Sequence, residues 1–248
     1  MNFFQAVAGA RNIPATTNGV VTNGLVWHID PTNAASYPGT GSTIFDLIGS
    51  NNGNFEGGTY VDANGHLRLD GVNDAVNFGV IDTTNAIALG AGSFTIQVWG
   101  YNVNTLTNIQ AMYCQTAIGG DPANRVIMFY YLPYPRFISA MWGPNSEQQQ
   151  TPNYGPNTTA NAWHFYTLRY DSAAGEMTIY VDTTNDPPVT SVINTGLVTR
   201  NLRVGSFGTS LSTYEWFGRL GALMQYNRAL SASEIAQNYN ATKSGYGL

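Results

Sequence analysis

The sequence predicts an all-β fold, a sandwich of two antiparallel sheets with one short helix near the C-terminus. From residue 25 onward, short segments with alternating apolar residues follow one another, separated by clusters of Gly, Asn, Asp and Pro. Helical periodicity is confined to residues 231 to about 241. About a dozen short strands must each bury one face, and two sheets packed face to face achieve this.

The predicted strands begin with the segments 25–29 and 66–70, the second of which alternates polar and apolar residues. Side chains alternate between the two faces of a strand. The segment 93–101 therefore presents two different faces, one with Phe94, Ile96, Val98 and Gly100 and the other with Thr95, Gln97, Trp99 and Tyr101. We expect Ile96 and Val98 to be buried in the core of the sandwich. Further strands are expected between residues 111 and 142.

The C-terminal half contains the clearest local signals. The segments 163–171 and 176–182 flank a Ser-Ala-Ala-Gly turn and predict a β-hairpin. Strands over 202–208 and 217–226 complete the series. Ser231 with Glu234 three residues later forms the capping-box pattern that starts a helix. Within that helix, Ile235 and Tyr239 are four residues apart, so both should face the sheet.

Composition excludes several classes of protein. Of the 248 residues, 10% are charged, against roughly 25% in an ordinary domain, and the net charge is −5. A negative chain has no electrostatic basis for binding nucleic acid. The 43% of apolar residues argues against disorder, and no apolar window is long enough to span a membrane. The single Cys114 excludes an internal disulfide and a cysteine-rich zinc site.

We divide the chain into an N-terminal arm, residues 1–23, and a domain, residues 24–248. The arm begins with a small apolar group that contains Phe3 and Phe4 and continues with polar, turn-rich residues. It lacks the basic start and the long apolar stretch of a secretory signal, so we expect none. The arm is either a floppy terminus or a segment that docks on a neighbouring subunit.

Three stretches together carry a family resemblance. They are GLVWHIDPTNAASYPGTGSTIFDLIGSNNGNF at 24–55, LRLDGVNDAVNFG at 67–79 and FGRLGALMQYNRALSASEIAQNYN at 217–240. Their order resembles the concanavalin A-like, laminin-G-type jelly-roll domains over about residues 24–242, and the piece Y-N-R-A-L-S-x-x-E-I at 226–235 is the most specific part. The resemblance implies a jelly-roll sandwich of two antiparallel sheets with one short C-terminal helix.

The opening segment of the domain is similar to versions found in phage and other viral structural proteins. With the scarcity of charge and the apolar arm, this favours a non-enzymatic virion structural protein. It would be a capsid decoration, minor capsid or fibre-associated subunit with a lectin-like domain. Phe3 and Phe4 would anchor it to other capsid subunits, as a homo-oligomer or in many copies on a particle. The alternative is a free carbohydrate-binding or adhesion module, extracellular or on a cell surface.

A glycoside hydrolase is a remote third possibility, since the concanavalin A-like fold also hosts such enzymes. They need two carboxylates flanking the scissile bond. The usual E-x-D-x-x-E spacing is absent, and the five glutamates are scattered along the chain. The sequence also lacks a G-x-S-x-G nucleophile motif and an H-E-x-x-H motif. We therefore expect no enzymatic activity, and we expect His164 to be packed within a strand.

Two candidate binding sites remain. Asp70, Asn73 and Asp74 form an oxygen-rich cluster of the kind that holds Ca²⁺, although Asx residues also favour turns by themselves. No cofactor is otherwise expected. The long loop at 144–161 brings aromatic and amide residues together, as sugar sites do. The glycan-binding candidates there are Trp142, Asn145, Tyr154 and Asn157.

Overall fold

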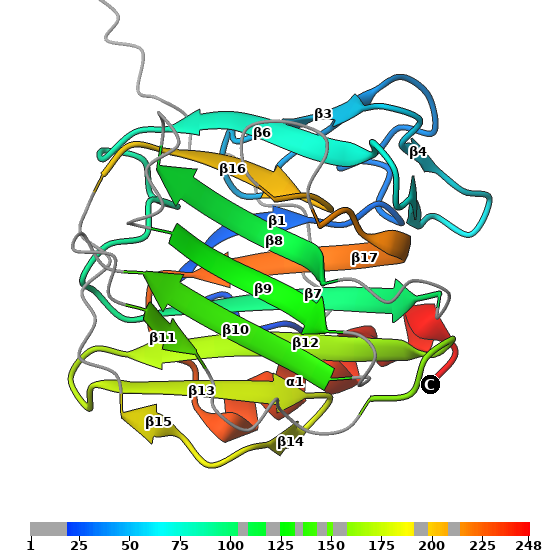
Figure 1. Cartoon of the computed structure of the whole chain (residues 1–248). Coiled ribbons are helices and arrows are strands. Elements are labelled where there is room, and N and C mark those ends of the chain that lie inside the picture. Colours follow the sequence, from blue (N-terminus) through cyan, green and yellow to red (C-terminus); the bar gives the residue numbers. More distant parts are fainter. Residues whose placement is uncertain are drawn as a thin grey trace, which may run out of the picture.

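The computed structural model describes residues 19–103, 109–117, 125–131, 136–142, 148–150, 158–190, 198–207 and 214–248. Two antiparallel β-sheets lie face to face, and a helix lies against the outside of one of them (Figure 1). The predicted all-β sandwich with one short C-terminal helix is confirmed. In the described part of the chain, no helix is long and apolar enough to cross a membrane.

The first sheet, which we call sheet A, has the strand order β14-β13-β12-β7-β17-β5-β4, with β1 beside β17 and β15 beside β13. Its strands are β1 (Leu25–Ile29), β4 (Tyr60–Val61), β5 (Leu67–Asp70), β7 (Phe94–Asn102), β12 (Trp163–Asp171), β13 (Glu176–Val181), β14 (Thr184–Asn185), β15 (Val189–Thr190) and β17 (Phe217–Tyr226). The predicted hairpin is the pair β12–β13, with Leu168 opposite Ile179.

The second sheet, sheet B, has the strand order β11-β10-β9-β8-β16-β6-β3-β2. Its strands are β2 (Thr43–Ile44), β3 (Gly53–Glu56), β6 (Ala75–Ile81), β8 (Gln110–Ala117), β9 (Arg125–Tyr131), β10 (Arg136–Trp142), β11 (Gln148–Gln150) and β16 (Arg200–Val204). The chain ends with helix α1 (Ala232–Thr242) and the 3₁₀ turn η1 (Lys243–Tyr246).

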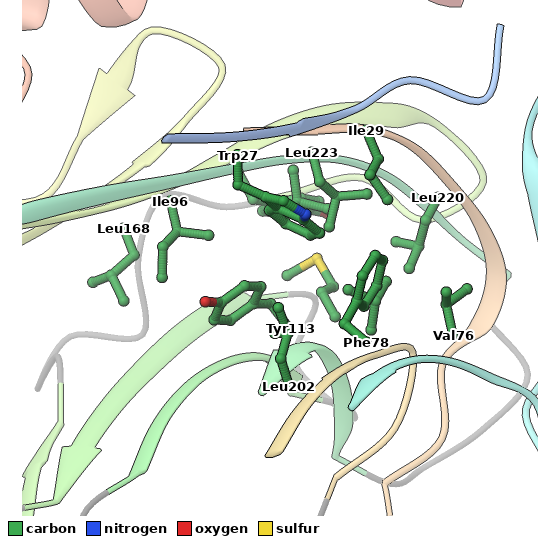
Figure 2. Close-up of a cluster of buried hydrophobic side chains, with 14 of the residues drawn as sticks. Trp27, Ile29, Val76, Phe78, Ile96, Tyr113, Leu168, Leu202, Leu220 and Leu223 are labelled. Atoms are coloured by element: carbon green, nitrogen blue, oxygen red, sulfur yellow. The ribbon is translucent and has the colours of Figure 1, made fainter. Parts of the chain in front are cut away.

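The main core lies between the two sheets (Figure 2). Trp27 is fully buried there and meets Phe78 edge to face, with 4.9 Å between the ring centres. The predicted inward face of β7 is confirmed, because Ile96 and Val98 belong to this core. Burial of apolar surface is the main stabilising contribution of such a core.

A second cluster lies on the outer face of sheet A, beneath α1 and η1. The ring of Trp99 stacks on that of Tyr246, with 4.2 Å between centres, and Ile235 of α1 is buried beside them. Tyr239 also stacks on Trp99, so both helix residues predicted to face the sheet do so. Strand β7 is therefore covered on both faces over much of its length.

Residues 19–23, which the sequence analysis assigns to the arm, pack against this second cluster. Val20 and Val21 are buried there, and the Val21 backbone N–H donates to Asn238 Oδ1 at 2.7 Å. The apolar contacts of these two valines make them part of the domain. Residues 1–18, with the predicted anchors Phe3 and Phe4, lie outside the described residues.

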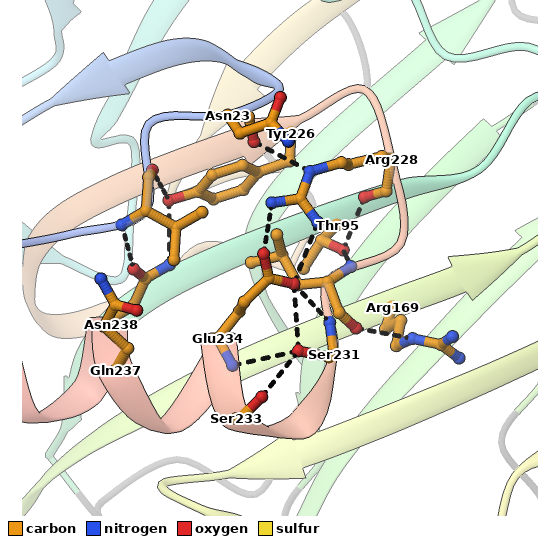
Figure 3. A network of polar contacts seen from close by, with 12 residues as sticks. Asn23, Thr95, Arg169, Tyr226, Arg228, Ser231, Ser233, Glu234, Gln237 and Asn238 are labelled. Atoms are coloured by element: carbon orange, nitrogen blue, oxygen red, sulfur yellow. Dashed lines mark hydrogen bonds and ion pairs between the residues drawn. The ribbon is translucent and has the colours of Figure 1, made fainter.

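The predicted capping box starts α1 (Figure 3). Ser231 Oγ accepts from the Glu234 backbone N–H, and Glu234 accepts from the Ser231 backbone N–H in return. Arg228 binds both Glu234 oxygens, at 2.6 and 2.9 Å, and donates from Nε to the Asn23 carbonyl. This network connects the start of the helix to the segment that leads into β1.

Candidate functional site

Beyond the edge of α1 and η1, the outer face of sheet A carries a line of aromatic and cationic side chains that we call the outer row. Its members lie on five neighbouring strands in direct register: Tyr60 (β4), Arg68 (β5), Arg219 (β17), Tyr101 (β7) and Trp163 (β12). Strands β17, β7 and β12 follow one another across the sheet (Figure 1). Side chains in such register are cross-strand neighbours on one face.

Alternation within β5 explains how this face arises. Leu67 and Leu69 point into the main core, so Arg68 and Asp70 point outward. Phe217 of β17 pairs with Asp70 and also lies on the outer face, half-buried. The alternation in β5 thus places the cation of Arg68 and the carboxylate of Asp70 beside the ring of Phe217.

A pocket of about 300 Å³ opens at the Tyr60 end of the outer row. It is lined by Gly58, Tyr60, Arg68, Leu69, Asp70, Asp74 and Phe217. The ring of Tyr60 is 54% exposed, so it can serve as a flat apolar surface at the rim. The volume is at the lower end of the range for small-molecule sites, about 300–1,000 Å³.

The charged groups of the outer row differ in how well they are paired. The Arg68 side chain makes no hydrogen bond or ion pair with any described residue. The Arg219 guanidinium lies over the Tyr101 ring, 5.0 Å from its centre, and its Nε is 3.7 Å from Asp62 Oδ2. The unpaired guanidinium of Arg68 is therefore the group most available to a ligand.

The three residues predicted to bind calcium lie at the turn between β5 and β6, and two of them line the pocket. Asp74 is buried, and its oxygens accept from the backbone N–H groups of Gly58 and Asp70. Asp70 Oδ1 accepts from the Val72 backbone N–H at 2.9 Å, and Asn73 is exposed. Burial is the main reason that the pKa of Asp74 is raised.

These hydrogen bonds fit the alternative that the Asp and Asn residues are present because they stabilise a turn. The calcium site stays a prediction. In the described ranges, no group of three or more His, Cys, Asp or Glu side chains could hold a metal ion. Only the side-chain oxygens of Asp70, Asn73 and Asp74 that accept no hydrogen bond within the turn would be free to bind a calcium ion.

The side chains of the four predicted glycan-binding residues lie outside the described part of the structure. Trp142 ends strand β10, but its side chain lies outside the described residues, as do Asn145, Tyr154 and Asn157 altogether. No motif in the sequence indicated Tyr60, Arg68 or Phe217 as ligand-binding residues. The only local signal was the alternation at 66–70, because the pocket is formed by pairing β5 with β17, about 150 residues later.

His164 links the loop before β12 to the end of the β12–β13 hairpin. Its Nδ1 lies 3.0 Å from Asp182 Oδ2, and Nε2 lies 3.0 Å from Thr159 Oγ1. The order of groups resembles a catalytic triad. However, the Thr159 backbone N–H also donates to Nε2, at 3.1 Å, and Asp182 Oδ1 accepts from the Phe165 backbone. Both side chains thus serve to hold backbone segments.

Two further histidines lie near the Trp163 end of the outer row. His66 packs against Trp163 with tilted rings, 4.6 Å between centres, and stacks on Tyr246, 5.6 Å between centres. His28 is only 3% exposed and lines a cavity of about 140 Å³ beneath η1, with Nδ1 unpartnered among the described residues. Burial lowers the pKa of both imidazoles, so both favour the neutral form.

Comparison with protein families identifies one match. The model of the concanavalin A-like lectin/glucanases superfamily matches residues 70–236. Sequence comparison with curated proteins gives no significant match.

Solved structures resemble the fold at low sequence identity. Trypanosoma rangeli sialidase in complex with 2,3-difluorosialic acid aligns with 91% of this chain at a TM-score of 0.67 and 15% identity. This chain spans only 34% of the sialidase. Domain 4 of an extracellular arabinanase from Geobacillus stearothermophilus, in complex with arabinotriose, aligns with 87% of this chain and 98% of that domain, with a TM-score of 0.61 and 13% identity.

The binding domain of botulinum neurotoxin DC, in complex with rat synaptotagmin II, aligns at a TM-score of 0.62 and 12% identity. The alignment covers 88% of this chain and 51% of the toxin chain. At such identities these likenesses concern the fold alone.

Proposed function

Because the chain belongs to the concanavalin A-like lectin/glucanases superfamily, we propose that it is a non-enzymatic protein that binds carbohydrate through the pocket beside Tyr60. The observation that carries the proposal is the combination around one pocket of an exposed aromatic residue, a carboxylate and a guanidinium that has no ion pair within the described part of the chain. A sugar presents apolar C–H groups on its face and hydroxyls at its edge. The Tyr60 ring suits the face, and Arg68 and Asp70 suit the hydroxyls.

One structural neighbour supports this choice of ligand. The arabinanase domain is in complex with arabinotriose. The alignment covers nearly the full length of that domain, so a single domain of this architecture is sufficient for a sugar complex.

The hydrogen bonds of Asp74, one of the two carboxylates that line the pocket, support a binding role without catalysis. A glycosidase needs one carboxyl that protonates the leaving oxygen and a second that acts as base or nucleophile. Asp74 has both oxygens engaged by backbone N–H groups and is buried. It is therefore poorly placed to donate a proton to a ligand in the pocket.

A panel of immobilised plant, bacterial and animal polysaccharides, probed with the full chain, tests the proposal. The expected result is binding to at least one polysaccharide without its hydrolysis, weakened about tenfold or more by Tyr60→Ala. Phe45→Ala is the matched control, because Phe45 is also an exposed aromatic but does not line the pocket. Equal binding by the parent and the Tyr60 variant would contradict this site, and turnover abolished by Asp70→Asn would contradict the non-enzymatic role.

We further propose that the chain acts in a virion, as a capsid decoration, minor capsid or fibre-associated subunit present in many copies. The scarcity of charge supports a surface that is largely covered by neighbouring subunits. Gly19, the first described residue, lies beside α1, where its carbonyl accepts a hydrogen bond from the Gln237 side chain. Phe3 and Phe4 would then anchor the subunit to its neighbours, with each buried phenyl ring contributing about 1.5–3 kcal/mol.

Incorporation into particles tests this second proposal. The double substitution Phe3→Ala, Phe4→Ala should reduce incorporation, since many weak contacts act together on a particle. The effect of salt on the parent should be small, because screening weakens charge–charge attraction and not apolar burial. Normal incorporation of the double variant would contradict the anchoring role.

A further inference from the structure

We propose that the outer row selects sugars that carry an anionic group, with Arg68 and Arg219 as the residues that recognise the charge. This inference rests on the proposed function and names the ligand class of the same site. It starts from the register of β5 and β17, in which Arg68 and Arg219 face each other directly.

Two like charges directly opposite each other on neighbouring strands destabilise a sheet. The arrangement is notable here because the whole chain has only 10 Lys and Arg residues in 248. A bound anion between the two guanidinium groups would remove the repulsion, so the free site is poised to accept a negative charge.

The carboxylates near the outer row do not neutralise the positive charges of Arg68 and Arg219. Asp62 lies 3.7 Å from Arg219, but its other oxygen already accepts from the backbone N–H groups of Asn64 and His66. Asp70 lies in the pocket but forms no ion pair with Arg68. Among the described residues, Arg219 therefore has one carboxylate partner at 3.7 Å and Arg68 has none, and Asp70 remains available as an acceptor for sugar hydroxyls.

The positions suit a sugar more than another anionic ligand. Tyr60 and Arg219 are separated by two strand spacings, roughly 10 Å, so one ligand can touch the Tyr60 ring and both arginines. A carboxylate can accept two parallel N–H bonds from one guanidinium and a further N–H bond from the second. Nucleic acid offers similar anions, but the net charge of −5 opposes its approach.

Matched pairs of oligosaccharides test the selection for charge. The probes are trigalacturonate with its methyl ester and sialyllactose with lactose, and in each pair the second member lacks the negative charge. The dissociation constant is measured by calorimetry with the full chain at low and high salt. The expected result is that an acidic member binds at least about tenfold tighter than its neutral partner, and that salt reduces this ratio.

Three variants separate charge recognition from general effects. Arg68→Gln should abolish the preference for the acidic member, and Arg68→Lys should retain part of it, since a lysine keeps the charge but loses the two-pronged geometry. Lys243→Gln is the control, because it removes the same charge from η1, away from the pocket. The melting temperatures of the variants show whether each is folded.

Equal affinity for both members of each pair would overturn the inference and leave the proposed function intact, provided that binding still depends on Tyr60. Persistence of the acidic preference in Arg68→Gln would likewise overturn it. Failure of all four probes to bind would also overturn the inference, while the polysaccharide panel decides the proposed function separately.

Discussion

The hydroxyl of Tyr246 lies directly against the backbone of Gly221 and accepts a hydrogen bond from the N–H of the next residue, Ala222, at 2.7 Å. A Cβ on Gly221 would overlap with the Tyr246 ring. This contact lets η1 lie close to β17, and it places Tyr246 between Trp99 and His66. The absence of one side chain thus determines how the C-terminus docks on sheet A.

Gly221→Ala should therefore displace Tyr246 and destabilise the fold by about 1–3 kcal/mol, as overpacking of a close contact does. The free energy of unfolding in urea measures the change. Gly92→Ala is the control, because a Cβ at Gly92 would meet open space. If the two variants lose the same small amount, Tyr246 can move aside freely and the docking described above is not rigid.

The second prediction concerns the main core. Ile179 of β13 is buried between the sheets, and its truncation in Ile179→Ala should cost about 2–5 kcal/mol by leaving a cavity. Val80→Ala removes atoms from an exposed side chain, so it should change the free energy of unfolding far less. A loss below about half a kcal/mol for Ile179→Ala would mean that β13 does not face the core.

The third prediction concerns stability between about pH 5 and 6.5. Burial lowers the pKa of His28 below 6.5, and the nearby Asp30 and Asp46 only partly oppose this. The unfolded chain then binds more protons than the folded one in this window. The free energy of unfolding should rise as the pH rises toward about 6.5 and level off above it.

His28→Gln should flatten this part of the stability profile, which urea unfolding at a series of pH values would measure. His66, whose pKa burial also lowers, should account for the slope that remains, so a double variant with His66→Gln is the natural control. An unchanged slope in the double variant would contradict the assignment.

The fourth prediction concerns acid. The hydrogen bonds from Arg228 lower the pKa of Glu234 to about 2, with further help from Ser231. The stabilisation is present above the unfolded pKa of about 4.5 and is lost as the pH falls toward 2. Glu234→Gln should lose roughly 1 kcal/mol at neutral pH, as a damaged helix cap does.

Denaturant unfolding between pH 2 and pH 7, in the parent and in Glu234→Gln, measures this effect. The two curves should converge at the acid end, since the parent also loses the charge there. If they remain parallel down to about pH 2, the Arg228–Glu234 pair contributes nothing that depends on ionisation.

The local residue pattern was sufficient to predict most strands, the helix and one of the residue faces that form the core. Alternation predicted that Ile96 and Val98 face inward, and the spacing of Ser231 and Glu234 predicted the start of α1. The same alternation placed Trp99 on the opposite face, but it carried no information on what covers that face. Tyr246 stacks there from about 150 residues further along the chain.

The sequence by itself determined the all-β class, the hairpin, the capped helix and the family, because each depends on residues close together in the chain or on a motif read in order. Only the tertiary structure decided the candidate site. Arg68 and Arg219 become neighbours through the pairing of β5 with β17, and a register shift of one residue would place them on opposite faces of sheet A. Such long-range pairing is selected by the combined burial of both sheets, and no local segment encodes it.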